Sequence, residues 1–346
     1  MILKIKNRIE SEISKFIRDI DKLYSLKSIS PVLFNNIKEF VSRKGKRIRP
    51  VLFIIGYLGF ARKPAPGLYR SAVSLELLHD FMLVHDDIID KSETRRGKPS
   101  MHARLNRYLK GYKNLKFNGQ DLTIVIGDVM YAMAIHAFLA VAEDKQRKEM
   151  ALKRLVEAAF YTGGGEFIEL LCGAKNIEEI TREDIYKIYD LKTANYTFAS
   201  PLTIGAILAG AGKLQVNKLF KYGTYLGRAF QIKDDVLGMF GKEAKTGKST
   251  LTDLKEAKKT ILIWYAYNHS NSKNKSLIKK ILRKKNVDKT DLSKMQRIII
   301  ETNTLDYVKK EILKFTKKAG GLQASFRMHP KYKELLSEYS NQILSL

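Results

Sequence analysis

The chain of 346 residues contains only one cysteine, seven prolines and 36 acidic residues. A lone cysteine, Cys172, excludes a disulfide within the chain and fits a reducing compartment. So few prolines leave room for long uninterrupted helices. The acids are outnumbered by 63 Lys and Arg, which gives a formal net charge of +27. At 45% hydrophobic residues there is ample material for a core, in one large domain or two.

No targeting signal is recognisable in the sequence. The first 16 residues are amphipathic but carry Glu10 and Glu12 and lack a cleavage pattern. The nearest approach to a membrane span, 122–142, is interrupted by Asp128 and His136, so we expect a buried core helix there. We therefore expect a soluble, cytoplasmic protein.

The positive charge is concentrated in residues 273–297, which hold ten Lys or Arg against Asp288 and Asp291. Such a segment usually solvates an exposed helix face, and we favour that interpretation. Weak attraction to an anionic membrane surface is the alternative. Nucleic acid is disfavoured, because the segment has no interleaved aromatic residues and no known reader motif.

Hydrophobic periodicity predicts helices nearly throughout. Strand-like alternation bounded by turn pairs is absent, and residues 110–120 form the clearest loop. Apolar residues recur at spacings of three and four in six stretches, 2–26, 33–42, 68–90, 122–142, 150–172 and 182–211. We expect a single all-α domain over residues 1–346.

An apolar stretch from Glu76 ends in three carboxylates, Asp86, Asp87 and Asp90. Asp86 and Asp90 are four residues apart and project from one face of a helix. Because unpaired buried charge is costly, the acids must meet water or a cation. Oxygen ligands of this kind suit Mg²⁺ that shares its other positions with water and phosphate. Taken alone, such a motif is more often the solvated end of a helix than a metal site.

A second apolar run, beginning near Phe220, delivers Asp234 and Asp235, with Gln231 on the same helical face. Two acidic groups, each at the end of its own apolar helix, are hard to explain as solvated surface. Facing each other across a cavity, they would hold metal ions for a diphosphate.

The chain resembles the trans-isoprenyl diphosphate synthases, in particular the short-chain archaeal type that makes geranylgeranyl diphosphate. The resemblance runs from about residue 44 to residue 260. Besides the two aspartate motifs it rests on five sequences in order, KGKRIRP at 44–50, RRG at 95–97, GD at 127–128, KT at 192–193 and GKSTLTDLKEAKKT at 247–260. It implies the isoprenoid synthase type I fold, a bundle of long, mostly antiparallel helices around a deep central cavity.

The resemblance also implies the site. Isopentenyl diphosphate would be held by four residues, Lys46, Arg49, His79 and Arg96. The allylic diphosphate would be held by four others, Arg95, Lys192, Lys248 and Lys258. Neutral contacts near the carbocation would come from Thr193, Phe230 and Gln231. Metal ligands would be Asp86, Asp87, Asp90, Asp234 and Asp235, with about three Mg²⁺ ions when substrate is bound. The family usually forms homodimers. Without the resemblance, His79 is an ordinary core histidine and the KRxR run is surface charge.

The reaction implied is the condensation of isopentenyl diphosphate with dimethylallyl, geranyl or farnesyl diphosphate. In this family the fifth and fourth residues before the first aspartate, here Phe81 and Met82, form a floor that sets product length. One large ring at Phe81 resembles the archaeal pattern, which favours geranylgeranyl diphosphate; farnesyl diphosphate, alone or as a second product, is the alternative. Phe81 is also an ordinary core residue, since a cavity wall is packed.

Four positions depart from the family pattern. Lys44 replaces a glycine, Glu166 and Glu169 replace Gln and Asp, and Gly238 stands where the second motif usually has its last acid. Glu166 would weaken diphosphate binding unless a lysine or metal offsets its charge. Similar archaeal-type members also lack the last acid, so we do not expect inactivation. A catalytically weak subunit of a heteromer is disfavoured, because both acidic pairs are present.

Two other functions are weighed. A class I terpene synthase should lack the isopentenyl diphosphate grip, whereas Lys46, Arg49 and His79 are present. A basic protein that binds membrane or nucleic acid, with structural acidic pairs, would show salt-sensitive nucleic-acid binding without prenyl transfer.

Overall fold

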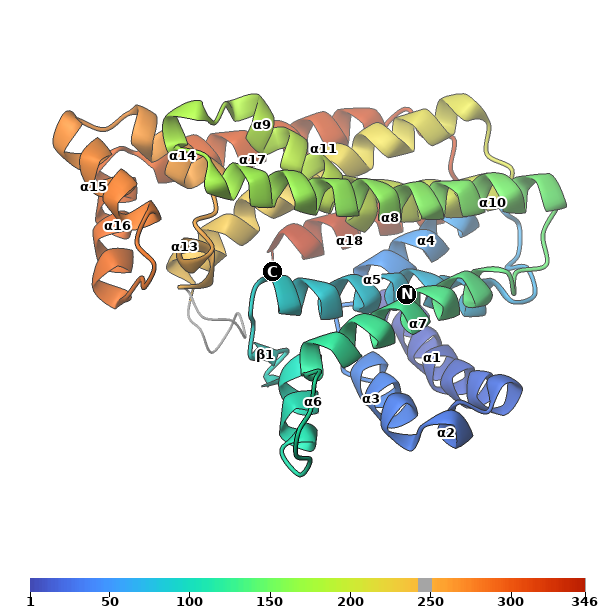
Figure 1. Ribbon diagram of the computed structural model, residues 1–346. Helices are drawn as coiled ribbons and strands as arrows, with labels where there is room; N and C mark the ends of the chain where they lie inside the picture. The colour runs from blue at the N-terminus through green and yellow to red at the C-terminus, as the bar shows by residue number, and fades with distance from the viewer. Residues whose placement is uncertain (242–250, 346) are drawn as a thin grey trace. The chain divides into compact units, whose positions relative to one another are not determined.

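The computed structural model describes residues 1–241 and 251–345 (Figure 1). These residues form helices and one pair of two-residue strands, β1 (Thr94–Arg95) and β2 (Lys98–Pro99). The all-α prediction is confirmed, with this short hairpin as its one departure among the described residues. The chain divides into two compact units. The single domain over 1–346 stays a prediction.

Unit 1 comprises residues 1–155, 201–212 and 328–336. Besides the two strands, its elements are α1 (Ile2–Tyr24), α2 (Leu26–Ile29), α3 (Pro31–Val41), α4 (Ile48–Leu58), α5 (Leu68–Ile89), α6 (Met101–Leu109), α7 (Gly119–Phe138) and parts of α8 (Lys145–Ala174), α10 (Ser200–Leu208) and α18 (Pro330–Ser345). Its core is built around α4, which is apolar on every face. From Pro50 to Leu58 each residue of α4 is buried, as expected of a helix hydrophobic all round.

Two long helices of unit 1, α5 and α7, pack side by side (Figure 1). Among the residues that the structure describes, α7 is the one helix long and apolar enough to cross a membrane, and 44% of its most apolar window is buried. Core helices pass the same test. The packing of α7 against α5 agrees with a helix in the stretch 122–142, but α7 ends at Phe138 and is only partly buried.

Unit 2 comprises residues 156–200, 213–327 and 337–346. Its elements are the remainder of α8 and α18, the 3-10 helix η1 (Ile177–Glu179), α9 (Arg182–Ile188), the π-helix η2 (Tyr189–Ala199), α11 (Lys213–Phe240), α13 (Thr252–Lys255), α14 (Ile261–Asn268), α15 (Ser272–Leu282), α16 (Lys289–Glu301) and α17 (Thr304–Gln323). Long α11 lies beside η2 and α17. The buried face of α14 supplies Ile261, Leu262 and Ile263 to an apolar core.

The basic residues 273–297 lie on α15, on α16 and on the loop between them. Helix α15 buries Ile278 and Ile281, and two of its lysines, Lys273 and Lys280, are exposed. Some of this positive charge is neutralised by ion pairs with nearby acids: Lys279 lies 2.8 Å from Glu178, and Lys284 lies 2.6 Å from Asp291. This is the arrangement of an amphipathic surface helix, in agreement with the favoured interpretation.

Two predicted helices are interrupted. The stretch 2–26 breaks at Ser25, whose φ of 52° is left-handed and ends α1. The stretch 182–211 is α9, η2 and α10 in succession. Pro201 gives a physical reason for the second change: it cannot donate to the carbonyl of residue 197, and its ring crowds that carbonyl, which favours a wider turn before it.

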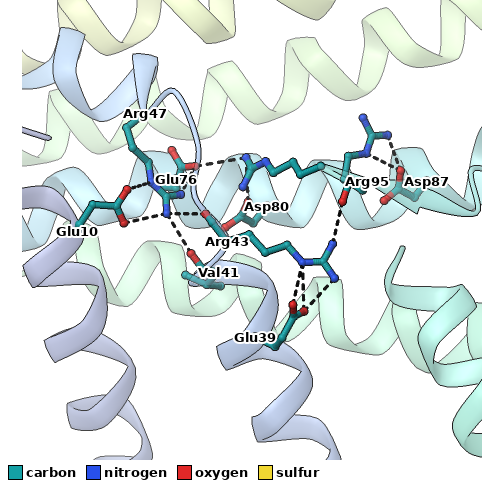
Figure 2. Close-up of polar contacts among 10 residues, drawn as sticks. Glu10, Glu39, Val41, Arg43, Arg47, Glu76, Asp80, Asp87 and Arg95 are labelled. Carbon is teal, nitrogen blue, oxygen red and sulfur yellow. Dashed lines mark hydrogen bonds and ion pairs between the residues drawn. The ribbon is translucent and has the colours of Figure 1, made fainter. Parts of the chain in front are cut away.

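The loop before α4 is fixed by a buried arginine (Figure 2). Arg47 has no exposed side-chain surface and donates to Glu76 at 2.5 Å and to Glu10 at 2.8 Å. It also donates to the backbone carbonyls of Val41 and Arg43, at 3.3 and 2.9 Å. One guanidinium therefore ties the loop to α1, α3 and α5.

A neighbouring arginine fixes the β-hairpin. Arg43 donates to the backbone carbonyl of Arg95 at 3.3 Å and to Glu39 at 2.9 Å (Figure 2). It also donates to the backbone carbonyl of Pro99 at 2.9 Å. The hairpin and the loop before α4 are thus held in one piece of unit 1.

We expect Arg47→Met to lower the free energy of unfolding by about 3–5 kcal/mol, because it removes the nearer of the two arginines that neutralise the buried Glu76 carboxylate. Urea unfolding followed by circular dichroism measures the loss. The adjacent, exposed Lys46→Met should change stability by less than about 0.5 kcal/mol. Equal stability of the two variants would contradict the assigned role of Arg47.

Candidate functional site

The first aspartate motif lies at the C-terminal end of α5. Asp87 is buried, whereas Asp86 and Asp90 are half-buried. The partial negative charge of a helix C-terminus disfavours carboxylates and attracts cations. Here Arg95 supplies one, donating to Asp86 at 2.9 Å and to Asp87 at 2.7 Å. Asp87 is thus engaged with Arg95, and Asp86 and Asp90 share the more open face.

The β-hairpin presents two adjacent arginines to different partners. Its turn is formed by Arg96 and Gly97, with left-handed φ values of 55° and 71°. Arg95 meets the aspartates, while the Arg96 guanidinium lies 3.6 Å from Glu76 and 3.8 Å from Asp80. A Cβ on Gly45 would lie 3.4 Å from the same guanidinium. The KGKRIRP loop and the RRG motif therefore meet in space.

The residues expected to hold isopentenyl diphosphate differ in exposure. Lys46 is exposed, whereas Arg49 and His79 are half-buried. Burial lowers the pKa of His79 well below its usual range, and the cations Arg49 and Arg96 act in the same direction. The imidazole is therefore neutral near pH 7. It can meet a diphosphate as a neutral hydrogen-bond donor.

Beside this group lies a carboxylate that the sequence patterns did not single out. Asp80 is fully buried, and neither of its carboxylate oxygens has a hydrogen-bond partner. Burial raises its pKa well above the usual range, and the Glu76 carboxylate raises it further, while Arg96 and Arg47 oppose the shift.

Phe81 sits on α5 about one turn before the aspartates. Its ring lies 5.2 Å from that of Tyr131 on α7 and 4.8 Å from that of His85. Met82, the second predicted floor residue, is half-buried. The structure thus adds Tyr131 to the predicted floor; it lies in the apolar stretch 122–142, where nothing in the sequence distinguishes it.

In unit 2, Asp235 ends a chain of hydrogen bonds. Thr193 donates to Gln231 at 2.6 Å, and Gln231 donates to Asp235 at 2.9 Å. Tyr189 also donates to Asp235, and its own oxygen accepts from the backbone N–H of Ile261 at 3.0 Å. The structure brings Thr193, Gln231 and Asp235 together, as the motifs lead us to expect, and adds Tyr189.

The two aspartates of the second motif have different surroundings. Asp234 is exposed, whereas Asp235 is buried. Burial raises the pKa of Asp235 well above its usual range; hydrogen bonds from Tyr189 and Gln231 lower it, and the neighbouring charges of Asp253 and Asp234 raise it. Asp234 is therefore the more accessible of the two to solvent.

Close packing in unit 2 positions the KT motif. A Cβ on Gly227 of α11 would lie 2.3 Å from Cα of Ala194 in η2, and one on Gly223 would lie 2.5 Å from Cα of Ala199. Only glycine permits this approach. Phe230, one helical turn after Gly227, packs its ring 5.3 Å from Phe198. The π-helix that carries Lys192 and Thr193 is therefore pressed against α11.

Glu166 and Glu169 of α8, which depart from the family pattern, both form ion pairs with one lysine. Lys192 Nζ lies 2.5 Å from a carboxylate oxygen of Glu166 and 2.5 Å from one of Glu169. Lys192 thus offsets the charge that Glu166 adds. Of the other two lysines predicted to hold the allylic diphosphate, Lys258 lies 2.6 Å from Glu256. Lys248 falls outside the described residues.

These donors fit a hard divalent cation. Asp86 and Asp90 are half-buried and Asp234 is exposed, and carboxylate ligands of this kind suit Mg²⁺. The two aspartate motifs belong to different units. Their facing each other across a cavity remains a prediction.

Comparison with known proteins gives the family. A family model described as polyprenyl synthetase matches residues 30–299. A short chain isoprenyl diphosphate synthase of Methanocaldococcus jannaschii is 29% identical, covering 88% of this chain and 84% of the relative. A geranylgeranyl diphosphate synthase of Saccharolobus solfataricus is 32% identical, covering 74% and 72%. A geranylfarnesyl diphosphate synthase of Aeropyrum pernix is 31% identical, covering 80% and 81%.

Solved structures agree. A geranylgeranyl pyrophosphate synthase from Corynebacterium glutamicum, complexed with isoprenyl diphosphate and magnesium, superposes with a TM-score of 0.89 at 25% identity, covering 99% of this chain and 98% of that one. The isoprenoid synthase fold is confirmed, as is the enzyme class that the motifs predict, a prenyltransferase. This chain belongs to the polyprenyl synthetase family.

Proposed function

We propose that the protein condenses isopentenyl diphosphate with dimethylallyl, geranyl or farnesyl diphosphate, and that its main product is geranylgeranyl diphosphate. The observation that carries the proposal is the arrangement along α5. Asp86 and Asp90 stand at its end, Phe81 lies about one turn below them, and a hairpin holds Arg95 against Asp86. A prenyl diphosphate could bind along this helix, with its diphosphate at the aspartates and its apolar chain toward Phe81.

The proposed chemistry needs no covalent intermediate with the enzyme. The allylic diphosphate loses inorganic pyrophosphate and leaves a delocalised carbocation. The double bond of isopentenyl diphosphate attacks the cation, and a proton then passes to the departing pyrophosphate. Arg95, Lys192 and Lys258 stabilise the charge that develops on the leaving group. Lys46, Arg49, Arg96 and neutral His79 hold the second diphosphate.

Magnesium completes the proposed site. About three Mg²⁺ ions, held by Asp86, Asp90 and Asp234, would neutralise the negative charge of the departing diphosphate. Asp87 and Asp235 are also predicted metal ligands, but Asp87 accepts a hydrogen bond from Arg95 and Asp235 accepts one from Tyr189. For these two we propose a supporting role beside the ions.

The direct test incubates the protein with radiolabelled isopentenyl diphosphate, Mg²⁺ and each allylic primer in turn. Chromatography of the dephosphorylated products gives their length. Geranylgeraniol as the main product supports the proposal, and farnesol would support the alternative. Absence of condensation with every primer would overturn the function.

We expect Asp86→Ala to lower turnover by about 10²–10³-fold or more, because a ligand for the charge-neutralising cation is lost. The fold should survive, since the Asp86 side chain is 20% exposed and Arg95 keeps its bond to Asp87. Turnover is measured with the same radiolabel, and Asp306→Ala, a change of an exposed acid on α17, is the control. Full activity of Asp86→Ala would remove the metal assignment.

Phe81→Ala should shift the products to longer chains, because it removes the ring beneath the growing tail. Tyr131→Ala should shift them in the same direction, since the two rings are in contact. Phe117→Ala, a change at a half-exposed loop position, serves as the control. An unchanged product distribution in both floor variants would place the floor elsewhere.

We also propose that the protein is a cytoplasmic homodimer. The unit 2 part of α8 exposes an apolar stripe at helical spacing, with Val156, Phe160, Phe167 and Leu171 exposed by 42%, 75%, 64% and 52%. A second copy of the same stripe is a self-complementary partner.

We further propose that the basic face of α15 binds weakly to anionic membrane surfaces. Co-sedimentation with anionic vesicles at low salt would detect this binding.

The double change Phe160→Lys/Phe167→Lys should convert the dimer to a monomer, because it places charge in an apolar contact. Light scattering after size exclusion measures the mass. Leu313→Lys, on the exposed face of α17, should leave the mass unchanged. A dimer that tolerates both lysines on α8 would contradict this interface.

A further inference from the structure

Asp80 on α5 is a buried carboxyl group that the proposed mechanism does not use. Its side chain has no exposed surface, and neither oxygen accepts a hydrogen bond from any residue that the structure describes. Its ion-pair partner within this part of the chain is Arg96, whose Nη2 lies 3.8 Å from Oδ1 of Asp80. By contrast, Arg47 lies 2.5 Å from Glu76 on the same helix. Asp80 is therefore held far more loosely than its neighbour one turn away.

The environment of Asp80 favours its uncharged form. The three guanidinium nitrogens of Arg47 donate to Glu10, to Glu76 and to backbone carbonyls. A fully buried carboxylate without hydrogen bonds takes up a proton rather than keep an unpaired charge. Burial and the Glu76 carboxylate raise the pKa of Asp80 well above its usual range, against the opposing effect of Arg96 and Arg47.

Arg96 keeps donors for a ligand. Its Nη2 faces the carboxyl groups of Glu76 and Asp80, whereas Nη1 is buried and has no hydrogen-bond partner among the described residues. The guanidinium lies close to the KGKRIRP loop, since a Cβ on Gly45 would lie 3.4 Å from it. The Arg96 side chain is 22% exposed, so an anion can reach it. A guanidinium with spare N–H donors suits a phosphate oxygen.

We propose that Asp80 is a positioning residue for isopentenyl diphosphate, and that it acts on Arg96 as an uncharged carboxylic acid. Its carbonyl oxygen accepts from Nη2 once the two side chains close up, and Nη1 is left for the diphosphate. An uncharged acceptor orients the guanidinium without cancelling its positive charge, whereas an ionised carboxylate would compete with the diphosphate for it. This inference rests on the proposed function.

The test compares uncharged replacements of Asp80. Asp80→Asn keeps the shape and the carbonyl oxygen, so KM for isopentenyl diphosphate should stay within about threefold of its value in the unaltered protein. Asp80→Leu keeps the bulk but removes the acceptor, and this KM should rise by about 10-fold. In both variants kcat and KM for farnesyl diphosphate should change by less than about twofold, because only binding of the other substrate is altered. Asp306→Leu, at an exposed acid of α17, is the control.

Stability and coupling separate this role from a merely structural one. Replacing an unbonded buried carboxyl group by an apolar side chain of similar volume is often neutral or stabilising, so Asp80→Leu should not unfold at lower urea concentration. Asp80→Ala removes the acceptor with less bulk and should raise the same KM. In an Arg96→Gln background, Asp80→Leu should raise KM for isopentenyl diphosphate by less than about twofold further, because the residue that Asp80 orients is gone.

Equal KM increases in Asp80→Asn and Asp80→Leu would show that the charge matters, and would overturn the inference. An unchanged KM in Asp80→Leu and Asp80→Ala would overturn it as well. Failure of the proposed function looks different, because the unaltered protein would then condense isopentenyl diphosphate with no primer, and the inference would fall with it.

Discussion

The structure of unit 1 depends on neutralising carboxylates that α5 carries into the interior. Glu76, Asp80 and Asp87 are all buried on this helix. Buried charge without a partner would cost several kcal/mol per group. Arg47 and Arg95 bond Glu76 and Asp87, and Arg96 lies near both Glu76 and Asp80. The loop before α4 and the β-hairpin are therefore placed by the charges of one helix.

Periodicity predicted the helices wherever packing follows a regular apolar stripe. The stretch 68–90 is α5 (Leu68–Ile89) almost to the residue, because its apolar content and its terminal acids mark both the body and the end. The stretches 2–26 and 182–211 were too long. Their breaks depend on the sign of φ at Ser25 and on a π-helical widening before Pro201, and neither changes the hydrophobic pattern.

The motifs identified the residues of the candidate site but did not distinguish the buried residues from the exposed ones. In the KGKRIRP motif, Lys46, Arg47 and Arg49 look alike in sequence, yet Arg47 is buried among acids and Lys46 is exposed. Asp234 and Asp235 are equally indistinguishable, although one is exposed and the other bonds Tyr189. Such differences are set by partners 29 to 46 residues away, which a local pattern does not contain.

The hairpin of Arg95 and Arg96 has a consequence for how two substrates would be aligned. Arg95 ends strand β1 and contacts Asp86 and Asp87, whereas Arg96 lies in the turn and its guanidinium lies near Glu76 and Asp80. In the proposed function, one arginine touches the donor and the next touches the acceptor, so a single peptide unit sets the gap between the reacting molecules. Inserting one residue in that turn would leave each grip chemically intact and yet hold the partners out of register.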